Sequence, residues 1–188
     1  MERISDIFGR MAGYSESDWE IFSAKLVRRD FSKGALLLKA GQTENFLSFI
    51  EKGIVRYFIP KLKNDITFGF SFEGEFESAY ESFLTRNPSA YSVQALTPTL
   101  LWSLTYEELE YVYQHTEMGN VIGRLMGEQQ FLKKARRELS LLNDTPEERY
   151  RKLFTERPNV IRNIPLKYIA SYIGVTPQAL SRIRKRIS

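Results

Sequence analysis

The chain has 188 residues, 43% of them hydrophobic and 27% charged, which is enough for one or two compact domains with a buried core. The absence of cysteine excludes disulfides, zinc–thiolate sites, iron–sulfur clusters and thiolate nucleophiles. No apolar run reaches the ~18 residues of a membrane span, and the first residues lack the basic and apolar regions of a secretory signal. We therefore expect a cytoplasmic protein with no membrane partner.

Positive charge is concentrated at the C-terminal end of the chain. Residues 143–188 contain ten Lys and Arg against four Asp and Glu, within a net charge of +4 for the whole chain. No acidic residue follows Glu156. A basic tail on a mildly acidic body predicts a polyanionic partner, with nucleic acid favoured over a tail that only improves solubility.

The first predicted element is a short amphipathic helix. Ser17–Glu20 has the form of a capping box, and Trp19, Phe22 and Leu26 then recur at helical spacing. From Lys33 onward, glycines separate short apolar segments.

Short strands with regular turns fill the middle of the chain. Apolar runs or period-two alternation predict strands at 54–59, 66–72, 91–95 and 100–104, and a short helix at 77–85 interrupts them. This pattern is typical of an antiparallel barrel or sandwich.

A long helix is predicted over residues 117–142, after a helix that a second capping box opens at Thr105–Glu108. Its apolar residues fall near heptad a and d positions: Met118, Val121, Ile122, Leu125, Leu132, Ala135, Leu139 and Leu142. We predict that this stripe pairs with a second copy in a homodimer; packing within its own domain is the alternative. Gly119, Gly123 and Gly127 lower helix propensity by up to ~1 kcal/mol each but permit close backbone approach.

Asn143 and Asp144 end this helix, and Thr145 caps the next one. Further on, Lys167–Ile173, a glycine turn and a second, basic helix have the layout of a helix-turn-helix DNA reader. Gly174 supplies the left-handed turn, Thr176 caps the second helix, and Leu180 and Ile183 face inward. An ordinary helical hairpin is the alternative.

The outward face of the second helix carries the predicted DNA contacts. Gln178 and Arg182 suit adenine and guanine edges, with Ser181 assisting. The predicted phosphate contacts are Thr176, Arg184, Lys185 and Arg186. A dimer would place two such helices in successive major grooves ~34 Å apart.

Several motifs occur in an order that resembles a known family. They are Lys33-Gly34, Ala40-Gly41, Phe49–Arg56 and Phe72–Phe76 in the strand region, and Ile169-Ala170, Ile173–Thr176 and Leu180–Ile183 in the tail. Over nearly its whole length the chain resembles the Crp/Fnr family of bacterial transcription regulators.

The resemblance implies an α+β fold in three parts. Residues 1–116 would form an antiparallel double-stranded β-helix, a jelly-roll barrel of the cyclic-nucleotide-binding type that acts as a sensor. Residues 117–142 would form the dimerisation helix and residues 143–188 the helix-turn-helix domain. The β-hairpin wing of the family has no obvious counterpart before Ser188. The expected partners are double-stranded DNA, a second copy of the chain and RNA polymerase.

The family's phosphate cassette reads Gly-Glu-Leu, followed later by an arginine, Ser or Thr, and Ala. At the corresponding positions this chain has Ser78, Ala79 and Tyr80, then Ser89 and Ala90. The glutamate and the arginine of the cassette, its two charged ligands, are therefore both missing. An ionised phosphate buried without a cation is costly, which disfavours cyclic AMP. We expect a different small-molecule effector, or none. The predicted effector pocket comprises Ser78, Ala79, Tyr80, Phe83, Arg86, Ser89 and Ala90, with Arg86 as the candidate replacement for the missing arginine; ordinary barrel core is the alternative.

Nothing in the sequence predicts an enzyme, a metal site or a resident cofactor. His115 is the only histidine, and neither a Walker-type loop nor a GxGxxG motif is present. Four nearby acids, Glu73, Glu75, Glu77 and Glu81, are interpreted as solvated side chains rather than as a glycosidase pair or a calcium site. The alternative to a gene regulator is a module that binds a cyclic nucleotide or other small ligand without sequence-specific DNA binding.

Overall fold

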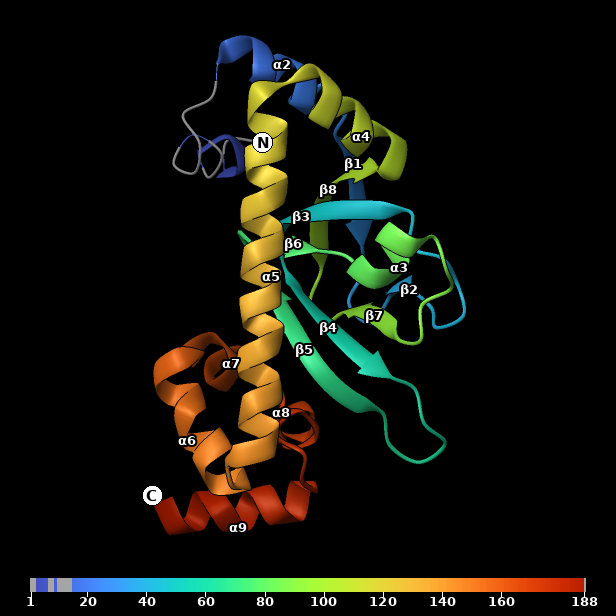
Figure 1. Ribbon diagram of the computed structural model, residues 1–188. Helices are drawn as coiled ribbons and strands as arrows, with labels where there is room; N and C mark the ends of the chain where they lie inside the picture. Colours follow the sequence, from blue (N-terminus) through green and yellow to red (C-terminus); the bar gives the residue numbers. More distant parts are fainter. Residues whose placement is uncertain (1–2, 7–8, 10–14, 188) are drawn as a thin grey trace. The chain divides into compact units, whose positions relative to one another are not determined.

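The computed structural model describes residues 3–6, 9 and 15–187 (Figure 1). Within the long helix, the side chains of Met118 and Ile122 lie outside the described part. The chain divides into two compact units, Met1–Tyr57 with Phe70–Glu128, and Phe58–Gly69 with Gln129–Ser188.

The first unit contains most of the strands. Its elements are α2 (Glu16–Ser23), β1 (Val27–Phe31), β2 (Leu36–Leu38), β3 (Phe46–Lys52), β6 (Phe76–Glu77), α3 (Tyr80–Thr85), β7 (Ser92–Ala95), β8 (Thr99–Thr105) and α4 (Tyr106–His115). Three elements have residues in both units: β4 (Ile54–Ile59), β5 (Ile66–Phe72) and α5 (Glu117–Asn143). The second unit adds α6 (Pro146–Glu156), α7 (Pro158–Asn163), α8 (Leu166–Ile173) and α9 (Pro177–Ile187).

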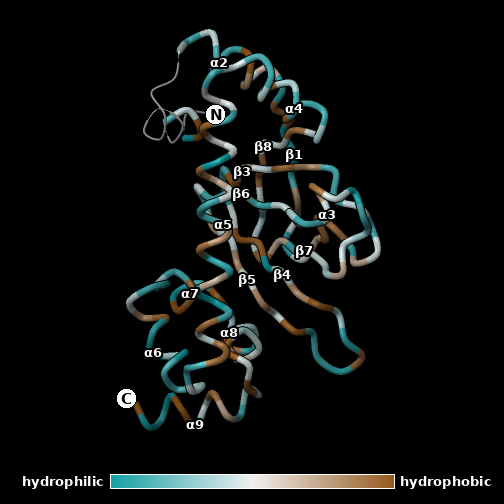
Figure 2. Tube along the Cα trace, in the orientation of Figure 1, coloured by the Kyte–Doolittle hydropathy of each residue, from teal (hydrophilic) through white to brown (hydrophobic). Residues whose placement is uncertain are grey.

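The strands form two four-stranded sheets with the orders β1-β8-β3-β6 and β2-β7-β4-β5. The pairings β1·β8, β3·β8, β3·β6 and β2·β7 are antiparallel. This is the predicted jelly-roll fold with a long helix and C-terminal helices, so the expected fold class is confirmed. Strands β4 and β5 carry hydrophobic residues along much of their length, whereas the loop that joins them is largely hydrophilic (Figure 2).

The two faces of the sheet that contains β3 have different partners. Leu47 and Phe49 pack with α2 and α4 in one core. Ile50 packs on the other face with Val55 and Val93 of the second sheet. Because side chains alternate along a strand, the even-numbered residues of β3 face the interior between the two sheets.

Capping residues fix where several helices begin. Two of the three predicted capping boxes are present, at Thr105 before α4 and at Thr145 before α6. The predicted box at Ser17–Glu20 is wrong, because α2 begins two residues before Asp18 and the backbone N–H of Asp18 donates to the hydroxyl of Ser15. Ser17 therefore lies inside the helix. Among the described residues, none of the helices combines the length and apolarity that a bilayer crossing requires.

Candidate nucleic-acid interface and sensor site

The C-terminal helices α8 and α9 meet at a tight turn. Gly174 ends α8 with a φ of +81°, a left-handed conformation that favours glycine. The backbone N–H of Val175 donates to the carbonyl oxygen of Ala170 at 2.9 Å, which closes the turn. The hydroxyl of Thr176 then accepts the backbone N–H of Ala179 at 3.2 Å and caps α9. The glycine turn and the threonine cap are both as the sequence predicts.

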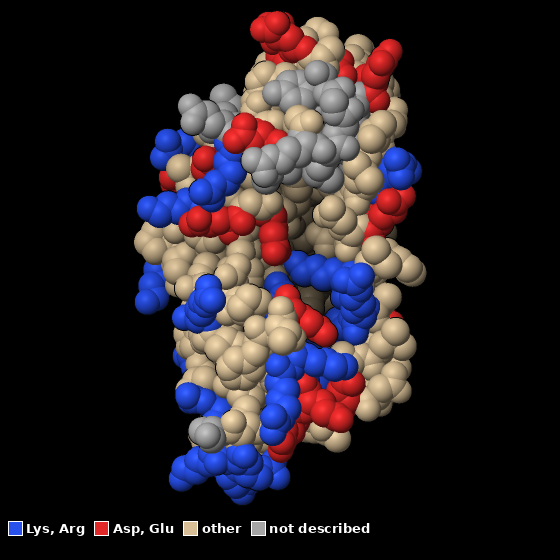
Figure 3. Space-filling model, turned by 90° about the vertical axis from the view of Figure 1, so that its left-hand side faces the viewer, with Lys and Arg blue, Asp and Glu red and all other residues tan. Residues whose placement is uncertain are grey.

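One face of α9 is buried and the other is exposed. Leu180 is 1% exposed and Ile183 5%, and they are buried along with Ile169, Ala170 and Ile173 of α8. All seven predicted DNA contacts have exposed side chains: Thr176, Gln178, Ser181, Arg182, Arg184, Lys185 and Arg186. Figure 3 shows blue, basic side chains gathered over α9. The helix therefore presents polar and cationic groups from a rigid apolar base.

One basic residue at the end of this face forms an ion pair with an acidic residue. The guanidinium of Arg186 lies 3.1 Å from a carboxylate oxygen of Glu147, at the start of α6. These two residues line a groove between α6 and α9 that also contains Arg182 and Lys185. Arg186 would have to exchange this ion pair for any contact with a phosphate.

Two arginines secure the C-terminus of α8. Arg149 of α6 donates from Nε to the carbonyl oxygen of Ile173 at 2.8 Å. Arg137 of α5 donates to the carbonyl oxygen of Tyr172, and its guanidinium lies 4.0 Å from the centre of the Tyr172 ring. Burial lowers the pKa of Arg137. The sequence did not reveal these roles, because neither arginine belongs to a local motif.

In the strand-rich unit, the predicted effector residues divide between two environments. Ala79 is fully buried with Ile50 and Val93 in the interior between the sheets. Phe83 instead belongs to the core beneath α2 and α4, where the Tyr80 ring stacks on it with centroids 6.4 Å apart. These residues therefore do not line a single surface.

The remaining predicted pocket residues serve local backbone contacts or lie on the surface. The hydroxyl of Ser78 donates to the carbonyl oxygen of Phe46 at 3.0 Å. The hydroxyl of Ser89 donates to the carbonyl oxygen of Tyr91 at 2.9 Å, and Ala90 is exposed.

Arg86 makes contacts that hold the end of α3. Its guanidinium donates to the carbonyl oxygen of Glu44 at 2.8 Å and to the side-chain oxygen of Asn45 at 2.7 Å. A third, longer contact of 3.3 Å reaches the carbonyl oxygen of Phe83. These contacts engage part of the N–H donors that the guanidinium could offer to a phosphate.

A carboxylate of the chain lies at the start of α3. Glu44 is 4% exposed and accepts the backbone N–H of Phe46 at 3.0 Å and that of Ala79, the N-cap of α3, at 3.5 Å. Burial raises the pKa of Glu44, although these backbone hydrogen bonds oppose the shift. A carboxylate of the chain itself thus accepts the N–H of Ala79.

Residues 28–116, which contain this barrel, match the family model described as the cyclic nucleotide-binding domain. The barrel is a cyclic nucleotide-binding domain. No curated protein matches the chain.

Solved structures share the fold over most of the chain. The c-di-GMP-responsive global regulator CLP of Xanthomonas campestris has a TM-score of 0.70 at 17% identity, covering 92% of this chain and 91% of CLP. FixK2 of Bradyrhizobium japonicum has a TM-score of 0.73 at 14% identity, covering 86% of this chain and 84% of FixK2. A protein of Eubacterium rectale described as a Crp/Fnr-family regulator has a TM-score of 0.69 at 14% identity, covering 92% of this chain and 83% of its own. The resemblance to Crp/Fnr regulators is thus confirmed in two respects: the family to which the barrel domain belongs, and the fold of the chain.

One acidic residue of the cyclic nucleotide-binding domain contradicts the sequence interpretation. Glu73 and Glu81 are exposed as expected, but Glu77 is only 2% exposed. The prediction of a solvated side chain is wrong at Glu77 because this residue lies in β6, opposite Ser48 of β3, and not in a loop or helix. Burial, reinforced by the nearby Glu44 carboxylate, raises the pKa of Glu77 to about 8.

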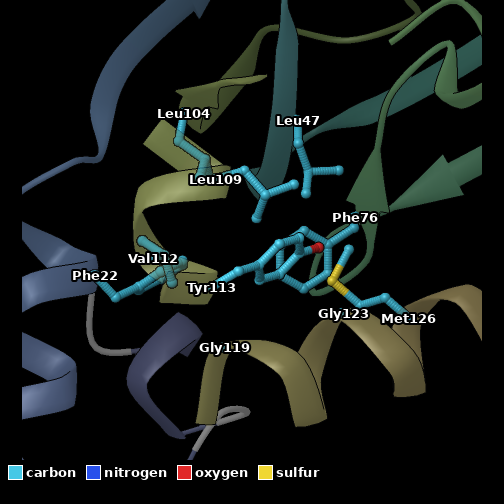
Figure 4. A pocket seen from close by; sticks show the side chains of 10 residues that line it. All are labelled: Phe22, Leu47, Phe76, Leu104, Leu109, Val112, Tyr113, Gly119, Gly123 and Met126. Carbon is cyan, nitrogen blue, oxygen red and sulfur yellow. The ribbon is translucent and has the colours of Figure 1, made fainter. Parts of the chain in front are cut away.

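A small apolar pocket lies where α4 meets the first turns of α5 (Figure 4). Its volume is about 20 Å³, and Figure 4 shows the Tyr113 ring extending across it toward Gly123. A Cβ at Gly123 would lie 2.6 Å from the Tyr113 hydroxyl, and one at Gly119 would lie 2.8 Å from the Val112 carbonyl oxygen. Both glycines therefore permit close packing of α5 on α4 within the domain.

Several apolar side chains of α5 are exposed. Among the predicted dimer contacts, Val121 is 36%, Leu132 49% and Leu139 57% exposed, while Leu125 is partly buried. The predicted contacts Met118 and Ile122 lie outside the described side chains. Phe131 at 71% and Leu142 at 75% add to this exposed apolar surface.

Proposed function

We propose that this protein is a dimeric, sequence-specific DNA-binding transcription regulator of the Crp/Fnr type, acting in the cytoplasm and, through its DNA complex, on RNA polymerase. The observation that carries this proposal is the exposed row of Gln178, Ser181 and Arg182 on the capped helix α9. A helix held on an apolar base with amide and guanidinium groups outward suits the major groove. The similar structures of CLP, FixK2 and the Eubacterium rectale protein support the assignment.

Dimerisation follows from the same proposal. A single helix-turn-helix covers one half-site, and two copies are needed for affinity and for a palindromic target. The exposed apolar residues of α5, including Leu132 and Leu139, provide a surface for a second copy. In this assignment residues 1–116 sense, residues 117–142 dimerise and residues 143–188 read DNA.

The barrel would regulate DNA binding through a small molecule other than cyclic AMP. Arg86, the candidate phosphate ligand, is engaged by protein oxygens, and the carboxylate of Glu44 lies at the start of α3. A cyclic phosphate placed there would meet the negative charge of Glu44.

Selection of the full chain against random duplexes, followed by fluorescence anisotropy on the enriched sequences, tests the proposal. We expect a palindrome with half-sites about one helical turn apart. We also expect affinity that falls steeply with salt. Equal, weak binding to enriched and scrambled duplexes would reject sequence-specific regulation and favour a ligand-binding module. Calorimetry with cyclic AMP checks the barrel argument, since micromolar binding would contradict it.

A further inference from the structure

The interior of the barrel contains a row of polar side chains that the function proposed above leaves unused. Ser48, Ser103 and Glu77 lie side by side across β8, β3 and β6, because Ser48 is the register partner of both of the others. All three are at most 2% exposed. They share the face of Ile50, which packs against the second sheet, so they face the interior between the sheets.

This row has unused hydrogen-bond acceptors. The oxygen Oε2 of Glu77 is buried and has no hydrogen-bond partner among the residues that the structure describes. The hydroxyl oxygens of Ser48 and Ser103 lie 2.8 Å apart and share one hydrogen, so an acceptor lone pair remains available in that pair. Buried acceptors without partners are rare and costly, which makes this row a candidate for an external donor.

When Glu77 is ionised, the charges around the row are negative on balance. Glu77 is influenced by the carboxylate of Glu44 from the segment before β3 and by the guanidinium of Arg29 from β1. The Arg29 guanidinium lies 4.0 Å from the centre of the Phe46 ring. Two phenols also interact with Glu77: Tyr57 of the second sheet and Tyr91, which directly precedes β7 of that sheet. Two carboxylates thus face one guanidinium and two neutral phenols.

We propose, building on the assigned sensor role, that the barrel interior binds a small primary ammonium compound, with its nitrogen at Glu77 Oε2 and the Ser48–Ser103 hydroxyl pair. An ammonium group has three N–H donors and one positive charge, which match this set of acceptors and their uncompensated charge. Tyr57 and Tyr91 pack against the apolar interior core and provide a surface for the carbon chain of the ligand.

Proton release gives this binding a distinctive signature. Burial raises the pKa of Glu77 to about 8, so near neutral pH the free carboxyl is mostly protonated. An ammonium ion binds the carboxylate, and the carboxyl proton therefore passes to the solvent as the ligand binds. Close to one proton should be released for each ligand bound at about pH 7.

Isothermal titration calorimetry on the full chain with n-butylammonium tests the proposal. We expect binding whose enthalpy changes with the ionisation enthalpy of the buffer, because a proton is released. Tetramethylammonium, which has no N–H donor, and 1-butanol, which has no charge, should bind at least about tenfold more weakly. Affinity for n-butylammonium should rise between about pH 6 and pH 8, because a smaller fraction of the Glu77 carboxyl is protonated and has to lose its proton on binding.

Two matched variants assign the binding to Glu77. Glu77→Gln keeps the shape of the side chain and should lose n-butylammonium affinity by at least about tenfold, together with the proton release. Glu81→Gln changes an exposed carboxylate of α3 and should leave both unchanged. Circular dichroism on both variants checks that they fold. If folded wild-type protein binds none of the probes at millimolar concentration, or if Glu77→Gln binds n-butylammonium as well as wild type does, the proposal is wrong.

The outcome is separable from that for DNA binding. If the wild-type protein binds a palindromic duplex but no amine, the regulator proposal stands and the ammonium site is rejected. If it binds n-butylammonium through Glu77 but no specific duplex, the ammonium site stands and the regulator proposal is rejected.

Discussion

Arg149 donates from Nε to the carbonyl oxygen of Ile173 at 2.8 Å, which links α6 to the last residue of α8. The last carbonyl groups of a helix have no partner within it, and Ile173 is buried. A charged donor at this point therefore holds the end of α8 and the turn that follows it. Helix α9 begins only four residues later, at Pro177.

Arg149→Met should lower the free energy of unfolding by about 1.5–3 kcal/mol, because it removes a hydrogen bond from a charged donor and leaves a buried carbonyl unpaired. Urea unfolding followed by circular dichroism measures the change. Arg162→Met, at an exposed arginine of α7, is the matched control and should change stability by less than about 0.5 kcal/mol. Equal stability of the two variants would show that the Arg149 contact contributes nothing.

Arg182→Ala should reduce discrimination at one base pair of the selected operator by about 1–3 kcal/mol. Arg184→Ala, the predicted phosphate contact two residues away, should instead weaken binding to all duplexes alike and lower the salt dependence. Anisotropy titrations on the operator and on its single-base variants distinguish the two patterns. If Arg182→Ala loses the same affinity on every duplex, Arg182 is a phosphate contact.

Local signals in the sequence were sufficient for much of the fold. Gly174 and Thr176 occupy the predicted turn and cap because each acts through its own backbone neighbourhood. The strand predicted at 66–72 coincides with β5, although burial does not alternate along it, because Thr67 and Ser71 are buried as well as Phe70 and Phe72. Such features need only a few consecutive residues.

Long-range contacts account for what the sequence left hidden. Glu77 looked solvated because Glu73, Glu75 and Glu81 lie near it in the sequence. It is buried in the structure through the pairing of β6 with β3, where it lies opposite Ser48, 29 positions earlier. Arg86 was a candidate phosphate ligand, but its contacts with Glu44 and Asn45 depend on a loop more than 40 residues away. No periodicity encodes contacts of this kind.

Leu139→Glu should dissociate the proposed dimer. The side chain is 57% exposed on α5, and a carboxylate placed in an apolar helix pair would be desolvated without a partner. Analytical ultracentrifugation should show a monomer for this variant at concentrations where wild type is a dimer. Lys134→Glu, an exposed charge change on the same helix, serves as control and should leave the mass unchanged. A dimer that survives Leu139→Glu would place the interface elsewhere.

Gly119→Ala and Gly127→Ala should have opposite effects on stability, although both improve helix propensity. A Cβ at Gly119 would lie 2.7 Å from the Thr116 hydroxyl and 2.8 Å from the Val112 carbonyl oxygen, so overpacking should cost about 1–3 kcal/mol. A Cβ at Gly127 meets no atom within 4 Å among the described residues, and this variant should gain up to about 1 kcal/mol. Thermal unfolding of the two variants in parallel measures the contrast, and a stabilised Gly119→Ala would contradict the close packing of α4 on α5.

Glu77 should make the protein less stable as pH rises. Burial raises its pKa from 4.5 to about 8, so between these values the folded protein retains a proton that the unfolded chain has released. The free energy of unfolding therefore falls with increasing pH through this window and levels off above about pH 8, by a total on the order of a few kcal/mol. Glu77→Gln resembles the protonated form and cannot titrate. Urea unfolding at a series of pH values should thus show that the free energy of unfolding of Glu77→Gln increases relative to that of wild type as pH rises. Glu81→Gln should have the same pH dependence as wild type. A constant difference between Glu77→Gln and wild type would mean that Glu77 is ionised in the folded protein at every pH tested.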